Sequence, residues 1–216
     1  MADYKFPTEM VELPSKGYFY FEGHPLSSGK VEIKYMTAKE EDILTSQTLI
    51  QQGTVIDKLL ESLIVDKSIK IKDMLIGDKN AIMVASRILG YGKDYDIEYD
   101  GVKQTVDLSK LEPVDIDFSK LTKGENKFSY TLPSSKREIT FKLLNSGDEN
   151  KISEEINARK KISENDTSEL TTRLKHMITS VDGKTETAYI NNFVQNEFLS
   201  LDSLAFRKHL ATITPD

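Results

Sequence analysis

Residues 77–92 read GDKNAIMVASRILGYG, and this stretch decides the fold expected for the chain. Its apolar residues recur at spacings of three and four, as they do on the buried face of a helix. These residues are Ile82, Met83, Ala85, Ile88 and Leu89. Asp78 is placed to cap the start of the helix, and Gly90 with Gly92 is placed to end it. We therefore expect a central, buried helix.

A second helix start lies upstream, in Thr37–Leu44 (TAKEEDIL). Thr37 and Glu40 have the spacing of a capping box, in which the carboxylate of the third helical residue reaches back to the amide of the capping residue. Helical periodicity continues to Ile50, and after Gly53 an apolar stripe spans residues 55–64. We interpret that stripe as core rather than as a partner surface. The first part of the chain is thus expected to hold a helical core.

The residues before Thr37 favour extended structure. Prolines at positions 7, 14 and 25 interrupt helix formation, and apolar residues alternate with charged ones over residues 31–35. The aromatic run at residues 18–21 must bury at least one side. We expect an extended segment that ends in a half-buried strand.

Two hairpins are predicted in residues 95–144. Asp100-Gly101 separates two alternating runs, which is a strong hairpin pattern. A second hairpin is expected between residues 127–132 and 138–144.

The last third of the chain is polar and helical. Residues 148–164 contain few apolar positions, so they form either a solvated helix or one that requires a partner. A better apolar stripe follows and is expected to stop at Asp182-Gly183, and two more helices are predicted at 185–199 and 203–210. The expected fold class is α+β, with an N-terminal extended segment and helical core (1–94), antiparallel β-hairpins (95–147) and a C-terminal helical arm (148–216).

Composition excludes several classes of function. The 216 residues carry a net charge of −6, which argues against a nucleic-acid-binding surface. The chain contains no cysteine, and its three histidines, His24, His176 and His209, are isolated in the sequence, so no metal site is expected. Because no apolar run is long enough for a membrane span, we expect a soluble, cytoplasmic protein. We find no catalytic motif and expect neither a cofactor nor a small-molecule substrate.

Three blocks of the sequence resemble one protein family. They are residues 12–20 (ELPSKGYFY), residues 35–44 (YMTAKEEDIL) and residues 73–91 (DMLIGDKNAIMVASRILGY). In this order they are similar to the core of the small baseplate hub proteins of T4-like contractile-tailed bacteriophages. Some members place paired cysteines after the Tyr-Gly step, and this chain has none there. The resemblance covers roughly residues 10–95.

The resemblance implies a role in building the phage baseplate hub. The protein would be a non-enzymatic chaperone that binds hub subunits in the host cytoplasm, or a permanent structural subunit of the hub in the virion tail. Candidate partner-binding residues are Ser15, Lys16, Tyr18, Phe19, Phe193, Phe198 and Phe206. Thr37, Glu40, Asp78 and Gly90 are expected to be structural caps. An enzyme of unrecognised type remains a third alternative, and Glu40, Glu41 and Asp78 are then the carboxylates to test first.

Overall fold

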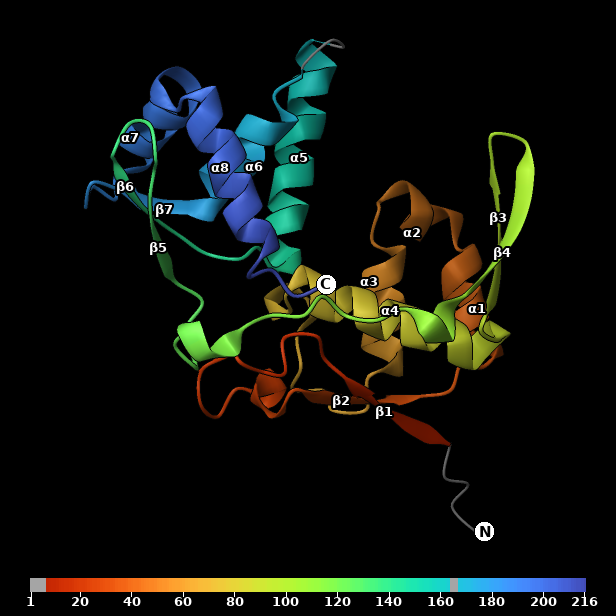
Figure 1. Cartoon of the computed structure of the whole chain (residues 1–216). Coiled ribbons are helices and arrows are strands. Elements are labelled where there is room, and N and C mark those ends of the chain that lie inside the picture. The colour runs from red at the N-terminus through yellow and green to blue at the C-terminus, as the bar shows by residue number, and fades with distance from the viewer. Residues whose placement is uncertain (1–6, 164–166) are drawn as a thin grey trace. The chain divides into compact units, whose positions relative to one another are not determined.

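A computed structural model describes residues 7–163 and 167–216 (Figure 1). The chain forms two compact units, and the α+β class predicted from the sequence is confirmed. The first unit runs up to Asp115 and includes Pro215 and Asp216, while the second unit spans Ile116–Thr214. The two predicted hairpins therefore belong to different units, and the C-terminal helices share a unit with the second hairpin.

The first unit begins with an antiparallel pair of strands. Strand β1 (Thr8–Glu12) pairs with β2 (Lys30–Lys34), and Val11 lies opposite Val31. Val31 and Ile33 are buried while Glu32 between them is exposed, because successive side chains of a strand point to opposite faces. The half-buried strand predicted at residues 31–35 is confirmed.

Helices of the first unit form its core. They are α1 (Ala38–Thr45), α2 (Gln47–Gln51), α3 (Val55–Leu63) and α4 (Ile76–Tyr91). Leu60 and Leu63 of α3 are fully buried, which confirms that its apolar stripe is core. The prediction of a single helix from Thr37 to Ile50 is wrong. Ser46 takes an extended ψ of 105° and separates α1 from α2.

The predicted start of α4 is wrong, and of the two glycines predicted to end it only Gly92 does so. The helix begins after Leu75, so Asp78 is its third residue and does not cap it. Gly90 lies inside the helix, and Gly92 ends it with a φ of 84°, a left-handed value that glycine adopts without steric cost. Ile82 is fully buried, but Met83 is 37% exposed, so α4 is only partly buried.

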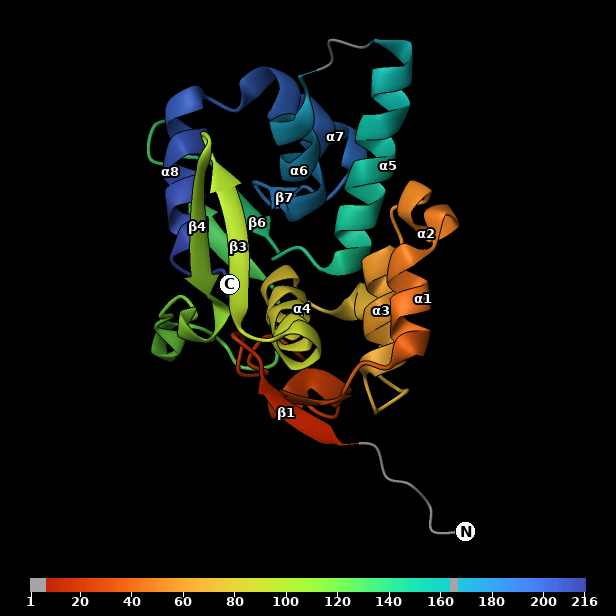
Figure 2. The same ribbon diagram turned by 90° about the vertical axis from the view of Figure 1, so that its right-hand side faces the viewer.

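The first predicted hairpin is confirmed. Strand β3 (Asp94–Tyr99) pairs with β4 (Val102–Asp107) through a turn at Asp100 and Gly101. Both turn residues have positive φ, as a tight two-residue hairpin turn requires. Every residue of β3 is exposed, and Figures 1 and 2 show this two-stranded hairpin standing away from the helices of its unit.

A three-stranded antiparallel sheet organises the second unit. Its strands lie in the order β5 (Phe128–Thr131), β6 (Glu138–Phe141) and β7 (Ile178–Val181). The hairpin of β5 and β6 was predicted, but β7 was expected to be helical. The helix ends at Met177 because the following β-branched residues pair with β6 instead.

Helices complete the second unit around this sheet. They are α5 (Ser146–Ile162), α6 (Glu169–Met177), α7 (Thr187–Asn192), a short π-helical segment (Phe193–Glu197) and α8 (Ser200–Ala211). The polar helix expected over residues 148–164 corresponds to α5. The helix expected over 185–199 is shorter, because α7 gives way to the π-helical segment. Ile152 of α5 is buried, whereas Ile162 is 90% exposed.

Candidate interaction sites

One buried carboxylate, that of Asp78, joins the first sequence block (residues 12–20) to the third block (residues 73–91). Ser15 donates to Asp78 twice, from its backbone amide at 3.0 Å and from its hydroxyl at 2.7 Å. Tyr20 donates its phenolic hydroxyl to the same carboxylate at 2.6 Å. The Tyr20 oxygen also accepts the backbone amide of Leu75 at 2.9 Å, which satisfies a free donor at the start of α4. Asp78 therefore anchors the segment around Ser15 to α4.

Burial sets the electrostatics of this network. Removal from water raises the pKa of the Asp78 carboxyl above its usual range, although the hydrogen bonds from Tyr20 and Ser15 oppose that rise. Burial and the neighbouring Asp78 charge also raise the pKa of the Tyr20 phenol far above its usual range. Both acidic groups are thus held in place by mutual hydrogen bonding, and Ser15, Asp78 and Tyr20 are all buried.

The structure also explains why a glycine stands at position 17 of the first block. It has a φ of 73°, and a Cβ atom there would lie 2.4 Å from the carbonyl oxygen of Ser27. The turn that contains Gly17 therefore packs directly against the backbone of residues 27–29. Any larger residue would separate these two turns.

The partner-binding residues predicted in this segment divide by exposure. Phe19 is only 4% exposed and Ser15 is fully buried, so neither side chain is available to a partner. Lys16 is exposed and Tyr18 is half-buried. Phe21, the last residue of the aromatic run, is 62% exposed.

The second block contains the predicted capping box, and the structure confirms it at Thr37 and Glu40. One carboxylate oxygen of Glu40 accepts the Thr37 amide at 2.9 Å and the Thr37 hydroxyl at 2.7 Å. The other accepts Lys34 at 2.8 Å and the Ser62 hydroxyl at 2.6 Å. Burial alone would raise the pKa of Glu40, but these four donors outweigh it and lower the pKa to about 2.

Two of the three phenylalanines proposed as C-terminal partner anchors belong to the interior of the second unit. Phe193 and Phe206 have no exposed surface, and Phe198 is half-buried. Phe206 packs edge-to-face on Phe141 of the sheet with ring centroids 4.9 Å apart, and Phe193 stacks on Phe198 at 5.1 Å. For Phe193 and Phe206 the expectation of a contact surface is wrong, because the sheet that β7 completes gives them a core to fill.

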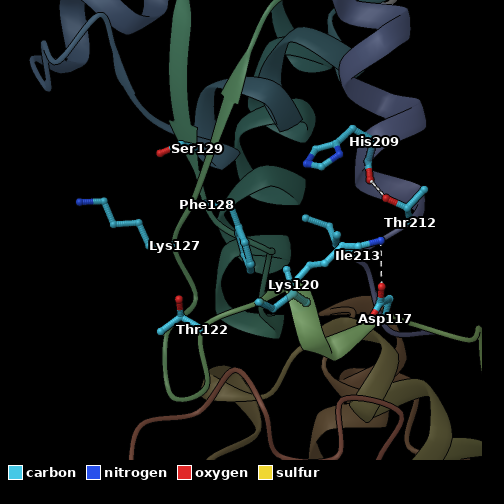
Figure 3. Close-up of a pocket in the computed structure, with 10 residues that line it drawn as sticks. Asp117, Lys120, Thr122, Lys127, Phe128, Ser129, His209, Thr212 and Ile213 are labelled. Atoms are coloured by element: carbon cyan, nitrogen blue, oxygen red, sulfur yellow. Dashed lines mark hydrogen bonds and ion pairs between the residues drawn. The ribbon is translucent and has the colours of Figure 1, made fainter.

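A cavity of about 490 Å³ lies within the second unit (Figure 3). The ring of His209 lines it together with Phe128 and Ile213. Burial lowers the pKa of His209, which favours the neutral ring. Lys120 pairs with Asp117 at 2.9 Å, and the side chains of Lys127 and Ser129 point away from His209. The cations near the cavity thus do not converge on one point, and the cavity does not form an anion site.

The carboxylates singled out for an enzyme are not brought together as a reactive group. Glu40 and Asp78 are each buried and accept several hydrogen bonds, whereas Glu41 is exposed near the start of α1. Among residues 7–163 and 167–216, no three metal-ligating side chains are grouped so that they could hold an ion. Within the same residues, no helix is both long and apolar enough to cross a membrane.

Comparison with known proteins identifies no relative of this chain. No protein-family model, curated protein sequence or solved structure matches it.

Proposed function

We propose that this protein is a non-enzymatic factor in assembly of the tail baseplate hub of a T4-like contractile-tailed bacteriophage. It would bind hub subunits as a chaperone in the host cytoplasm before they dock. The proposal rests on the resemblance of three sequence blocks, which all lie in the first unit. Blocks one and three share the buried hydrogen-bond network of Ser15, Tyr20 and Asp78.

The arrangement of the blocks supports the resemblance as a likeness between folded units. The second block is tied to the body of the unit by Glu40, which accepts hydrogen bonds from Lys34 on β2 and from Ser62 on α3. A buried polar group needs all its partners at once, because an unsatisfied one costs about 1–3 kcal/mol. Residues in such networks are therefore expected to change together rather than one at a time.

The exposed part of the first block is the surface we assign to hub subunits. Lys16 and Phe21 are exposed and Tyr18 is half-buried, and all three lie on the segment that Ser15 and Tyr20 anchor. An anchored turn that presents a cation and aromatic rings is a favourable contact surface, because its backbone is already ordered before binding. The buried phenylalanines of the second unit have no part in this surface.

Mass spectrometry of purified phage particles and of assembly intermediates from lysate tests the role. We expect the protein in intermediates that contain hub subunits and not in mature particles. A fixed copy number in the particle would instead make it a permanent hub subunit. If it is found in neither, the assignment to the baseplate is wrong.

Co-purification with hub subunits tests the surface. The double variant K16E/F21S should lose hub subunits, whereas S28A, on the neighbouring turn, should retain them. Truncation before α5 is unsuitable for this purpose. It would remove β7 and the helices that cover the sheet, and the second unit would then lose its core.

A further inference from the structure

The two units repeat the same order of elements (Figure 1). In the first unit, β1 and β2 form a hairpin, α1 to α3 follow, and the chain then returns to β2 at Ile64 before α4 begins. In the second unit, β5 and β6 form a hairpin, and α5 and α6 follow. The chain then returns to β6 through β7 and, after α7 and the π-helical segment, enters α8.

The return to the hairpin has the same geometry in both units. Ile64 pairs antiparallel with Ile33 of β2, and Ile178 pairs antiparallel with Phe141 of β6. Ile64 and Ile178 each directly follow a helix, and their φ and ψ values are −65° and 126° against −74° and 127°. The amide of each donates to the carbonyl oxygen four residues earlier. All four side chains are buried.

The helix that follows each hairpin begins with the same arrangement of charges. A lysine near the end of the second strand lies three residues before the capping residue and six before the carboxylate of a capping box. The lysine nitrogen lies 2.8 Å from this carboxylate in the first unit and 2.7 Å in the second. The residues are Lys34, Thr37 and Glu40 in the first unit and Lys142, Asn145 and Asp148 in the second.

An aspartate in the first turn of the last helix holds the hairpin turn in each unit. Asp78 and Asp202 are the third residues of α4 and α8, and both are fully buried. Asp78 accepts the amide of Ser15 at 3.0 Å. Asp202 accepts the amides of Ser134 at 2.6 Å and Ser135 at 3.0 Å. The same residue type at the same helical position thus makes the same contact across 63 residues in one unit and 68 in the other.

The two hairpin turns also begin alike. Residues 13–16 read LPSK and residues 132–136 read LPSSK. The buried leucine donates its amide to the carbonyl oxygen of the residue that ends the turn, at 2.8 Å in the first unit and 2.9 Å in the second. The lysine has a φ of 50° at Lys16 and 61° at Lys136, a left-handed conformation that is uncommon for residues other than glycine.

The sequences correspond once the elements are matched. Residues 31–44 (VEIKYMTAKEEDIL) align without a gap with residues 139–152 (ITFKLLNSGDENKI). In both segments the first and third residues are apolar and buried, and the fourth is the lysine of the capping arrangement. Four residues after the anchoring aspartate, Ile82 of α4 and Phe206 of α8 have no exposed surface.

Chance is a poor explanation of this correspondence. A capping box or a Pro-Ser turn is common by itself, because each satisfies backbone groups locally. The contact of a helical aspartate with the hairpin turn and the return of the chain to the second strand depend instead on tertiary structure. Both occur in each unit, in the same order along the chain.

We infer that the second unit is a second copy of the fold of the first, so that the chain is internally duplicated. Each copy has its own set of three anchors: the buried aspartate, the lysine-linked capping box and the strand return. The duplication would hold whether or not the protein acts in a phage baseplate.

The copies differ in what is added to the shared fold. Residues 13–29 join β1 to β2, whereas the shorter segment 132–137 joins β5 to β6. Phe21 lies in the part of the longer turn that the second copy lacks. The hairpin of β3 and β4 follows α4 and has no counterpart among the described residues of the second unit. Under the proposed function, the hub-binding surface would therefore belong to the first copy alone.

Hydrogen exchange of single amides, measured by NMR on the full-length protein, tests the duplication. Asp78→Ala should speed exchange of the Ser15 amide at least tenfold and leave the amides of Ser134 and Ser135 within about twofold of the parent, because each copy has its own anchor. Asp202→Ala should have the opposite pattern. Asp42→Ala removes an exposed carboxylate and should change neither set.

A second pair of variants applies if an aspartate variant does not fold. Lys34→Met and Lys142→Met remove the equivalent lysines, which are both half-buried. Each should speed exchange of the capping-residue amide severalfold in its own unit, at Thr37 or at Asn145, and leave the other unit unchanged.

Two results would overturn the inference. One is that the amides of Ser134 and Ser135 are unprotected in the parent protein or unaffected by Asp202→Ala, because the second unit would then lack the shared anchor. The other is that a substitution in one unit speeds exchange equally in both, because the anchors would then belong to one cooperative body rather than to two copies.

Discussion

The Tyr20 hydroxyl donates to the Asp78 carboxylate at 2.6 Å, and the two side chains come from segments 58 residues apart in the chain. Asp78 is fully buried, so its carboxylate needs hydrogen-bond donors inside the first unit, and Tyr20 supplies one of them. It links the aromatic run that follows the Leu-Pro-Ser-Lys-Gly turn to the first turn of α4. The network therefore fixes where the exposed Lys16 and Phe21 are presented.

Removal of the Tyr20 hydroxyl tests the weight of this contact. Tyr20→Phe leaves the Asp78 carboxylate without one donor and the Leu75 amide without its acceptor. We expect a loss of about 2–3 kcal/mol in the free energy of unfolding, measured by urea denaturation. Tyr99→Phe is the matched control, because Tyr99 is 81% exposed and its hydroxyl is open to water. Equal effects of the two substitutions would show that the network contributes little.

Glu40 should make the stability of the first unit depend on pH. Its pKa is about 2 in the folded protein against an ordinary value of 4.5, so its stabilising effect is complete above pH 4.5 and is lost as the pH falls toward 2. Glu40→Gln should therefore be less stable than the parent by about 2–3 kcal/mol at neutral pH. The difference should narrow below pH 4.5. Denaturation midpoints measured from pH 7 to pH 2 test this, with the exposed Glu61→Gln as control. A difference that is independent of pH would contradict the assignment.

Gly77 allows the backbone of Pro215 to approach α4. A Cβ atom at position 77 would lie 1.8 Å from the Pro215 carbonyl oxygen, which is impossible without movement of residues 215 and 216. We expect Gly77→Ala to release these residues and to make them accessible to carboxypeptidase. Asn80→Ala provides the comparison, because it removes only the hydrogen bond to Asp216, at 3.0 Å, and creates no clash. Equal digestion of the two variants would show that close approach at Gly77 is not needed.

Phe206 should behave as a core residue of the second unit. Phe206→Ala would leave a cavity beside Phe141 and should lower the free energy of unfolding by about 3–5 kcal/mol. Leu201→Ala lies on the same helix at a position that is 70% exposed, and it should change stability by less than about 0.5 kcal/mol. Thermal unfolding followed by circular dichroism measures both. If Phe206→Ala changes the free energy of unfolding only slightly, Phe206 is not a core residue and is again a candidate for partner binding.

Local sequence patterns predicted the structure correctly where the interacting residues are neighbours along the chain. The capping box at Thr37 and Glu40 forms within four residues, and the turn at Asp100 and Gly101 depends on the φ values of two adjacent residues. The alternation of Val31 and Ile33 with charged residues likewise predicted their burial. In each case the interacting groups are close in sequence, so composition and spacing carry the necessary information.

Tertiary pairing decided the features that the sequence misassigned. Asp78 is a residue type that often caps helices. Ser15 and Tyr20 come within hydrogen-bonding distance of it only after the chain folds back, and their hydrogen bonds make Asp78 a buried anchor. Residues 178–181 continue a helical pattern, but β6 offers them backbone partners, and β-branched side chains favour that pairing. Phe193 and Phe206 lacked an evident core in the sequence because that core is built on the sheet that β7 completes. The sequence by itself determined the α+β class, the capping box and both hairpins. The tertiary structure decided which side chains are buried and which stay exposed, because burial depends on contacts between residues distant in the chain.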